Sequence, residues 1–227
     1  MKRHIVITED GSSSFFSAEV KQYYHSHFGA LQESMHIFIN AGLCSEYLSH
    51  LAHISILEIG FGTGLNALLT YFKAEELNKK IYYETVELYP LTFQEAAQLN
   101  YPNILDYENV KEIFTTLHST PWDENVVISE HFTLNKRKIS AIDAHFSPST
   151  FNLVYFDPFS PDVQPELWTK TVFESIYNSM KENAILLTYC TKGTVKEVMR
   201  NIGFEVEKLP GPAGKREILR VYRRLMM

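Results

Sequence analysis

Cysteine is scarce in this sequence, and long hydrophobic runs are absent from it. Cys44 and Cys190 are the only cysteines among 227 residues, so neither a disulfide framework nor a thiolate zinc site is indicated. No apolar run approaches the roughly 20 residues that a membrane-spanning helix needs. The nine histidines are scattered without the spacing of metal ligands. We therefore expect neither a metal site nor contact with a membrane.

The N-terminus also lacks the features of a secretory signal. Its apolar part, residues 5–7, is short and is soon followed by Glu9 and Asp10, so we expect a cytoplasmic protein. With 45% hydrophobic residues, a chain of this length can bury one sizeable core. A single elaborated domain is the default expectation.

The net charge of −6 argues weakly against a dedicated nucleic-acid binder, but the charge is unevenly distributed. Residues 1–189 hold 12 basic and 23 acidic side chains, whereas residues 190–227 hold 9 basic and 4 acidic ones. A basic C-terminal segment on an acidic body is typical of a phosphate-binding surface. An ordinary solvated face would give the same pattern.

Apolar, β-branched runs alternate with helical patterns from about residue 50 onward, which predicts an α/β fold with a doubly wound sheet. Near-continuous apolar runs such as residues 153–156 suit central parallel strands covered by helices on both faces. The last two candidate strands are separated only by a turn at residues 210–214, so they must pair antiparallel. The candidate strands are residues 55–59, 82–87, 138–142, 152–157, 184–189, 204–208 and 218–222.

Two segments fall outside this minimal plan. Residues 1–50 form an N-terminal extension that we expect to pack on the core, and residues 88–137 form an insertion within the domain of residues 51–227. Ligands of open α/β sheets bind beyond the carboxyl ends of the strands. We expect both segments to lie there and to determine substrate specificity.

The most informative stretch runs from Ile56 to Asn66 and contains Gly60, Gly62 and Gly64 between an apolar strand and a helical pattern. Glycine allows the backbone to approach a ligand closely, and a helix N-terminus leaves N–H groups unpaired. The order G-x-G-x-G departs from the dinucleotide fingerprint G-x-G-x-x-G. It resembles motif I of class I S-adenosylmethionine-dependent methyltransferases, whose seven-stranded, Rossmann-like sheet has an antiparallel last strand. A purely structural turn is the alternative.

Three carboxylates accompany this turn. Glu58 lies two positions ahead of the first glycine and would face the ammonium group of the cofactor. Glu87 ends the second predicted strand, where a carboxylate can accept both ribose hydroxyls; a solvated strand end is the alternative. Asp143 follows the third predicted strand, where this fold commonly contacts the adenine amino group, although Asp suits a helix N-cap there equally well.

A second motif, Asp157-Pro158-Phe159-Ser160-Pro161, follows an apolar strand. It resembles motif IV of amino-group methyltransferases. An alkylammonium has a pKa near ~10 in water, so a carboxylate here can accept its proton or orient the deprotonated amine for in-line attack. A structural turn aspartate is the alternative.

The whole chain resembles one family, the methyltransferase domain of the bifunctional tRNA 5-methylaminomethyl-2-thiouridine biosynthesis proteins and its stand-alone relatives. The Phe-Asp-x-Phe-Ser-Pro block and the downstream Pro-Glu-Leu-Trp-Thr block are far more specific than the glycine turn. The matching stretches are residues 24–26, 29–34, 38–43, 57–66, 156–161, 165–169, 187–190 and 203–217. No second glycine-rich fingerprint follows, so we expect the FAD-dependent oxidase half to be absent and the substrate to arrive as a free amine.

The resemblance implies S-adenosylmethionine as cofactor, tRNA as partner and methylation of 5-aminomethyl-(2-thio)uridine at the wobble position. By position, Asp157 is the catalytic residue. Cofactor binding falls to Glu58, Gly60, Gly62, Thr63, Gly64, Asn66, Glu87 and Asp143. Substrate contacts fall to Glu33, Phe159, Lys215 and Arg216, of which the last two would grip phosphate. An amine methyltransferase for a small molecule or a protein, and a catalytically silent S-adenosylmethionine-binding protein, are the alternatives.

Overall fold

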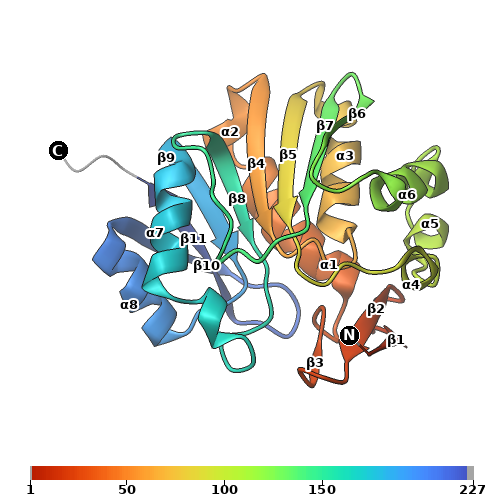
Figure 1. Cartoon of the computed structure of the whole chain (residues 1–227), viewed down its shortest axis with the longest axis horizontal. Coiled ribbons are helices and arrows are strands. Elements are labelled where there is room, and N and C mark those ends of the chain that lie inside the picture. Colours follow the sequence, from red (N-terminus) through yellow and green to blue (C-terminus); the bar gives the residue numbers. More distant parts are fainter. Residues whose placement is uncertain (1, 224–227) are drawn as a thin grey trace.

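The structure is a computed structural model that describes residues 2–223. An eight-stranded sheet in the order β10-β11-β9-β8-β4-β5-β7-β6 forms its centre (Figure 1). Five neighbouring strands, from β9 to β7, run parallel, whereas β11 is antiparallel to both β9 and β10. The strands are β4 (His53–Ile59), β5 (Lys80–Val86), β6 (Asn125–Ser129), β7 (Phe132–Arg137), β8 (Phe151–Phe156), β9 (Met180–Thr188), β10 (Phe204–Pro210) and β11 (Glu217–Arg223). The predicted α/β class and the antiparallel terminal hairpin are confirmed.

Helices cover both faces of the sheet, which explains why its central strands are apolar throughout. On β8, Leu153 and Tyr155 pack into the core beneath α3 (Leu65–Leu77) and the π-helix η1 (Met35–Leu43). The alternate side chains, Val154 and Phe156, pack beneath α7 (Lys170–Ser179) and α8 (Gly193–Ile202). The two-residue period of the strand therefore supplies one apolar side chain to each layer in turn.

The third strand of the parallel sheet is Phe132–Arg137, so the prediction of a strand at residues 138–142 is wrong. Phe132, Leu134 and Lys136 alternate as the buried face of β7, and the lysine hides this pattern in the sequence. Its ammonium is buried because it donates to two backbone carbonyls, those of Leu117 and His118. Residues 140–144 form a hydrogen-bonded turn instead of a strand.

The sheet has eight strands rather than the seven expected because residues 88–137 contribute β6 as an antiparallel edge strand beside β7. The rest of this segment contains α4 (Phe93–Ala96), α5 (Tyr101–Ile104) and α6 (Val110–Ser119). These helices lie to one side of the molecule, beside α3 (Figure 1).

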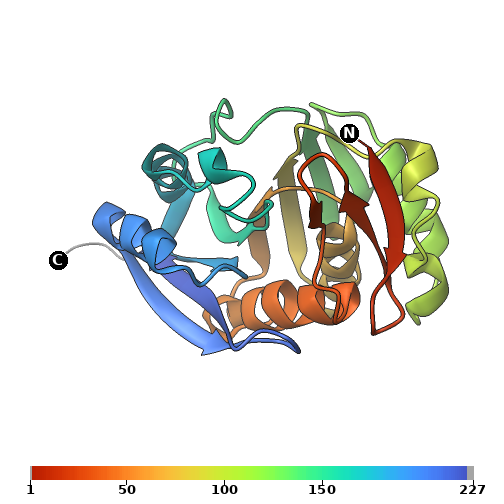
Figure 2. The same ribbon diagram turned by 90° about the horizontal axis from the view of Figure 1, so that it is seen from below.

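The N-terminal segment begins with a separate antiparallel sheet of β1 (Arg3–Ile7), β2 (Ser13–Ser17) and β3 (Gln22–Tyr23). It continues through α1 (Ala30–Ser34) and η1 into α2 (Glu46–Ser49). Figure 2 shows the small sheet in front of the large one when the molecule is seen from below. None of the helices within residues 2–223 has the length and apolar content of a bilayer span.

Candidate active site

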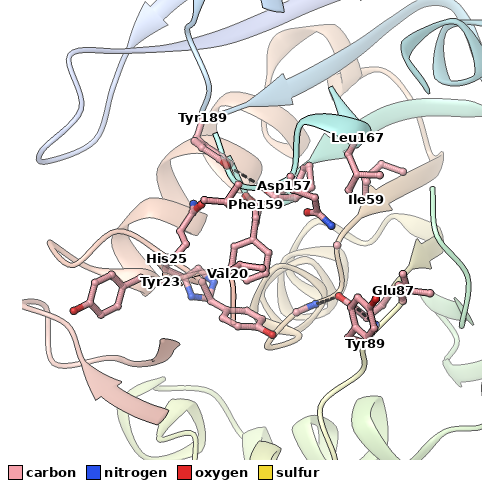
Figure 3. A pocket seen from close by; sticks show the side chains of 18 of the residues that line it. Val20, Tyr23, His25, Ile59, Glu87, Tyr89, Asp157, Phe159, Leu167 and Tyr189 are labelled. Atoms are coloured by element: carbon pink, nitrogen blue, oxygen red, sulfur yellow. Dashed lines mark hydrogen bonds between the residues drawn. The ribbon is translucent and has the colours of Figure 1, made fainter. Parts of the chain in front are cut away.

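A cavity of about 770 Å³ opens beyond the carboxyl ends of β4, β5 and β8. Its walls come from the loops that follow the strands of the large sheet and from the N-terminal segment. They include residues 19–27, Glu33, Gly60 and Gly62 of the glycine turn, the end of β5, residues 139–141, 157–159, 163–164 and 166–167, Tyr189 and Lys215. Figure 3 shows Glu87 and Tyr89 at one end, and Asp157, Phe159 and Tyr189 towards the other. Of the 88–137 insertion, Leu88 and Tyr89 line it.

The glycine turn joins β4 to α3 and requires glycine at each alternate position. Gly60, Gly62 and Gly64 all have positive φ angles, of 95°, 50° and 73°. A Cβ on Gly60 would lie 2.9 Å from the carbonyl oxygen of Asp157, and one on Gly64 would lie 2.9 Å from Nε2 of His118. The turn is therefore held between the loop after β8 and the insertion.

Glu87 is fixed across the cavity mouth by two backbone donors. Its Oε2 accepts from the N–H of Gly62 at 3.1 Å, and its Oε1 accepts from the N–H of Tyr89 at 2.8 Å. The carboxylate thus joins the end of β5 to the glycine turn and faces the cavity. This geometry presents acceptor oxygens to hydroxyl groups of a ligand.

Glu58 is completely buried and lies beneath the turn rather than on the cavity wall. Neither of its carboxylate oxygens has a hydrogen-bond partner of normal geometry among the described residues. Burial raises the pKa of Glu58 to about 7, against the opposing effect of the nearby polar groups of Thr85, Asn66 and Tyr83. A buried carboxylate without a partner is costly, and a cationic ligand group would offset that cost.

Asp157 follows β8 and extends one carboxylate oxygen towards α3. Its Oδ2 accepts from Nδ2 of Asn66 at 3.1 Å, and its backbone N–H donates to the carbonyl of Ile59 at 3.1 Å. Burial raises the pKa of Asp157 well above its ordinary value; Glu33 and Glu58 act in the same direction, whereas Asn66 and Lys215 oppose it. A carboxylate in this position holds a proton more tightly than one in water.

The loop that carries Asp157 is rigidly held by side chains that sequence reasoning did not assign to the site. The carbonyl of Pro158 accepts from the hydroxyl of Tyr189 at 2.8 Å, and that of Phe159 accepts from Nε1 of Trp168 at 2.8 Å. Gln22 reaches the loop from β3, accepting from the N–H of Ser160 at 3.2 Å. Trp168 and Tyr189 lie in stretches that resemble the family, residues 165–169 and 187–190. That resemblance was the one signal in the sequence that could have assigned them to the site.

Tyr24 covers the glycine turn and the loop that carries Asp157. Its ring lies edge-on to Phe159, with centroids 4.9 Å apart, and a Cβ on Gly62 would lie 3.4 Å from it. The hydroxyl of Tyr24 accepts from Nε of Arg3 at 2.7 Å. The N-terminal sheet therefore closes the cavity from above the glycine turn, and Tyr24 was not among the predicted site residues.

Glu33 and Lys215 form an ion pair inside the cavity, with Nζ and Oε1 3.2 Å apart. The other oxygen of Glu33 accepts from the N–H of Ser26 at 2.7 Å. Nζ of Lys215 also lies 4.4 Å from the centroid of the Tyr189 ring. The structure thus brings Glu33, Lys215 and Asp157, which are far apart in sequence, to one end of the cavity.

Of the remaining predicted residues, two line a second, smaller space and two lie outside the cavity. Thr63 and Asn66 line a smaller space of about 20 Å³ beneath Tyr24. Asp143 is exposed and outside the cavity, whose wall is formed there by Ser140 and Ala141. Arg216 is exposed and also outside it.

Several basic side chains of the C-terminal segment form ion pairs. Lys192 pairs with Asp162, Lys208 with Glu217, and Arg220 with Glu207. These pairs reduce the number of free basic side chains, but only Asp162 lies outside residues 190–227, so the segment keeps most of its net positive charge.

A parallel sheet with a positive-φ glycine turn at one strand end and fixed carboxylates at two others defines a Rossmann-like enzyme that binds a nucleoside cofactor. The sequence profile described as "S-adenosyl-L-methionine-dependent methyltransferase" matches residues 94–224, more than half of the chain. This chain belongs to that family, and S-adenosylmethionine is its cofactor.

Curated relatives share sequence along almost the whole chain. It is 28% identical over 223 residues to the tRNA 5-methylaminomethyl-2-thiouridine biosynthesis bifunctional protein MnmC of Azoarcus sp. (strain BH72), covering 93% of this chain and 34% of the relative. The MnmC protein of Burkholderia thailandensis is also 28% identical, over 225 residues, with 95% and 34% covered. The chain therefore spans about a third of the length of these relatives.

Solved structures agree with the fold. The crystal structure of MNMC2 from Aquifex aeolicus superposes with a TM-score of 0.81 at 24% identity, over 99% of this chain and 71% of the other. Spermidine synthase from Thermotoga maritima gives a TM-score of 0.55 at 8% identity, over 100% and 81% of the two chains.

The residues present fit S-adenosylmethionine. Glu87 lines the cavity and would hold the ribose hydroxyls. Glu58 would face the methionine end from beneath the turn, and neither of its carboxylate oxygens has a hydrogen-bond partner of normal geometry among the described residues. The cavity volume lies within the range of small-molecule sites, ~300–1,000 Å³.

Proposed function

We propose that this chain is the N-methyltransferase that converts 5-aminomethyl-(2-thio)uridine at the wobble position of tRNA to 5-methylaminomethyl-(2-thio)uridine. The observation that carries the proposal is the position of Asp157, whose carboxylate faces the cavity that also contains the glycine turn and Glu87. Amine chemistry needs a proton acceptor at the reacting nitrogen, and Asp157 is suited to that role. The names of the curated relatives support the choice of tRNA nucleoside.

The reaction joins a nitrogen to a methyl group. Bound S-adenosylmethionine supplies that methyl group on a sulfonium, so the N–C bond forms as the S–C bond breaks and a thioether leaves. The nitrogen must present a free lone pair, and one proton must leave it. Asp157 accepts this proton, and its raised proton affinity suits an amine better than an ordinary carboxylate would. Asn66 orients the carboxylate through its hydrogen bond to Oδ2.

We call the end of the cavity that contains Glu33, Asp157 and Lys215 the amine end. Its side chains support a cationic substrate group. Two carboxyl groups, those of Asp157 and Glu33, share this end with one ammonium, that of Lys215, and their oxygens can accept hydrogen bonds from an alkylammonium. Phe159, held edge-on by Tyr24, offers an aromatic wall against which a uracil ring would stack.

Contacts with the rest of the tRNA would come from the loop between β10 and β11. Arg216 is exposed on this loop next to Lys215, and we assign to it a phosphate contact outside the cavity. In this proposal residues 51–227 form the catalytic domain, and residues 1–50 are an extension that closes the substrate side. A tRNA substrate implies a cytoplasmic location.

Mass analysis of tRNA nucleosides tests the proposal directly. Cells that lack the gene should lose 5-methylaminomethyl-(2-thio)uridine and accumulate the 5-aminomethyl nucleoside, and the wild-type gene should reverse both changes. A gene carrying Asp157→Asn is the matched control and should not reverse them. Unchanged levels of both nucleosides in the deletion strain would show that the substrate is a different amine.

A further inference from the structure

Two side chains from the insertion hold one residue of the cofactor-binding turn. The hydroxyl of Tyr101, in α5, donates to Oγ1 of Thr63 at 3.2 Å. Nε2 of His118, in the last turn of α6, lies 3.1 Å from the backbone carbonyl oxygen of Thr63. Thr63 is almost fully buried, so neither of its oxygens relies on water for a partner.

His118 can hold a carbonyl because its Nε2 lies within hydrogen-bond distance of one and its ring is fixed by its neighbours. Burial lowers the pKa of His118 to about 4, with the nearby ammonium of Lys136 acting in the same direction and the bond to Thr63 opposing it. A contact with a carbonyl oxygen requires the proton on Nε2. The ring packs against Phe61 and Phe114, with centroids 5.4 and 4.7 Å away, so its orientation is fixed.

The end of α6 is anchored as well. Lys136 donates to the carbonyls of Leu117 and His118 at 2.7 and 3.1 Å, and its ammonium lies 4.8 Å from the centroid of the Trp122 ring. This satisfies carbonyls that the last turn of a helix leaves without partners. The position of His118 therefore depends on β7, a strand of the main sheet, and not on the insertion alone.

We propose that the helices α5 and α6 of the insertion are cofactor-positioning elements, and that Tyr101 and His118 are the positioning residues that hold the Thr63 peptide in its binding conformation. Three glycines make the turn flexible in an unfolded or loosely held chain. Contacts that fix it before the ligand arrives reduce the entropy lost on binding. The inference goes beyond the proposed function, since it concerns the family's cofactor and needs no tRNA.

The test is calorimetric binding of S-adenosylmethionine to the full chain without tRNA. Tyr101→Phe deletes one hydroxyl and should raise the Kd roughly threefold to tenfold, the range of one neutral hydrogen bond. His118→Leu should do the same, whereas His118→Gln, whose amide N–H can replace the Nε2 donor, should restore binding to near the wild-type value. The KM for S-adenosylmethionine should rise together with the Kd in Tyr101→Phe.

Tyr107→Phe is the matched control. This tyrosine lies in the same insertion and stacks on Phe72, with ring centroids 4.3 Å apart, away from the glycine turn. Both Tyr→Phe variants remove one hydroxyl, but only Tyr101→Phe should change the Kd. An unchanged Kd in Tyr101→Phe would overturn the proposal. So would an equal rise in both variants, because that result would mean that the insertion acts through general stability.

Discussion

The two ends of the cavity differ in whether backbone or side-chain groups form them. The cofactor end is the part of the cavity at the glycine turn and Glu87. It is mostly backbone, and the N–H of Gly62 in this turn donates to Glu87. The amine end consists of side chains from distant segments, with Glu33 on α1, Asp157 after β8 and Lys215 between β10 and β11. A backbone site can be recognised from one continuous stretch of sequence, whereas a side-chain site exists only after folding.

The two ends also differ in the partners of one buried glutamate at each end, Glu33 and Glu58. At the amine end, Glu33 already has both a cation and an N–H as partners. At the cofactor end, Glu58 has neither among the described residues. Glu33 is therefore paired before any ligand binds, whereas the buried carboxylate of Glu58 still lacks a partner of normal geometry among the described residues.

The largest effect is expected at the amine end, from Asp157→Asn. This variant keeps the shape and can still bond to Asn66, but it cannot accept a proton. Loss of a general base typically costs about 10²- to 10⁴-fold in rate, so kcat should fall by that amount while the Kd of S-adenosylmethionine changes less than about twofold. Single-turnover kinetics and calorimetry measure the two quantities. A large rise in Kd would instead assign Asp157 to the cofactor end.

The next effect is a pH dependence of stability that comes from Glu58. Glu58 has an ordinary pKa of 4.5 that is raised to about 7 in the fold, so its contribution to stability is present below pH 4.5 and is lost as pH rises through 7. Glu58→Gln removes this loss. Without cofactor, the variant should be more stable than the wild type at pH 8, by on the order of 3 kcal/mol, and no more stable at pH 4.5.

Urea denaturation at the two pH values measures this difference in the free energy of unfolding. Glu182→Gln, a change of the same chemistry at an exposed position, should show no such pH dependence. If Glu58 is the partner of the cofactor ammonium, as we propose, the cofactor should reverse the order, because Glu58→Gln would weaken its binding. If Glu58→Gln bound the cofactor as tightly as the wild type, the ammonium would have to lie elsewhere.

The contrast between backbone and side chains also explains what the sequence could predict. The glycine turn, the strand that precedes Asp157 and the antiparallel tail follow from local patterns, and the structure has all three. The third strand was misplaced because a buried lysine, Lys136, interrupts its apolar alternation, and only the distant carbonyls of α6 explain that burial. Local patterns do not encode such partners.

The same limit applies at the site. Glu33 and Lys215 were both predicted, but no spacing in the sequence indicates that they pair across 182 positions. Tyr24 and Gln22 were missed because their roles depend on how β3 lies over the loop of residues 157–161. Asp143 was predicted to follow a strand at residues 138–142, but that strand does not exist and Asp143 lies on an exposed turn outside the cavity.

The smallest effect is expected outside the cavity, from Arg216→Ala. Lys215 is unsuitable for this test because its removal would also leave Glu33 without its cation. Loss of one phosphate contact should raise the KM for tRNA about twofold to fivefold and reduce the slope of log KM against log salt by about one, with kcat unchanged. Lys80→Ala removes the same charge at the first residue of β5, the opposite end of that strand from Glu87, and should change neither quantity. Equal behaviour of the two variants would mean that the β10–β11 loop does not contact the tRNA backbone, and substrate recognition would then be confined to the side chains that line the cavity.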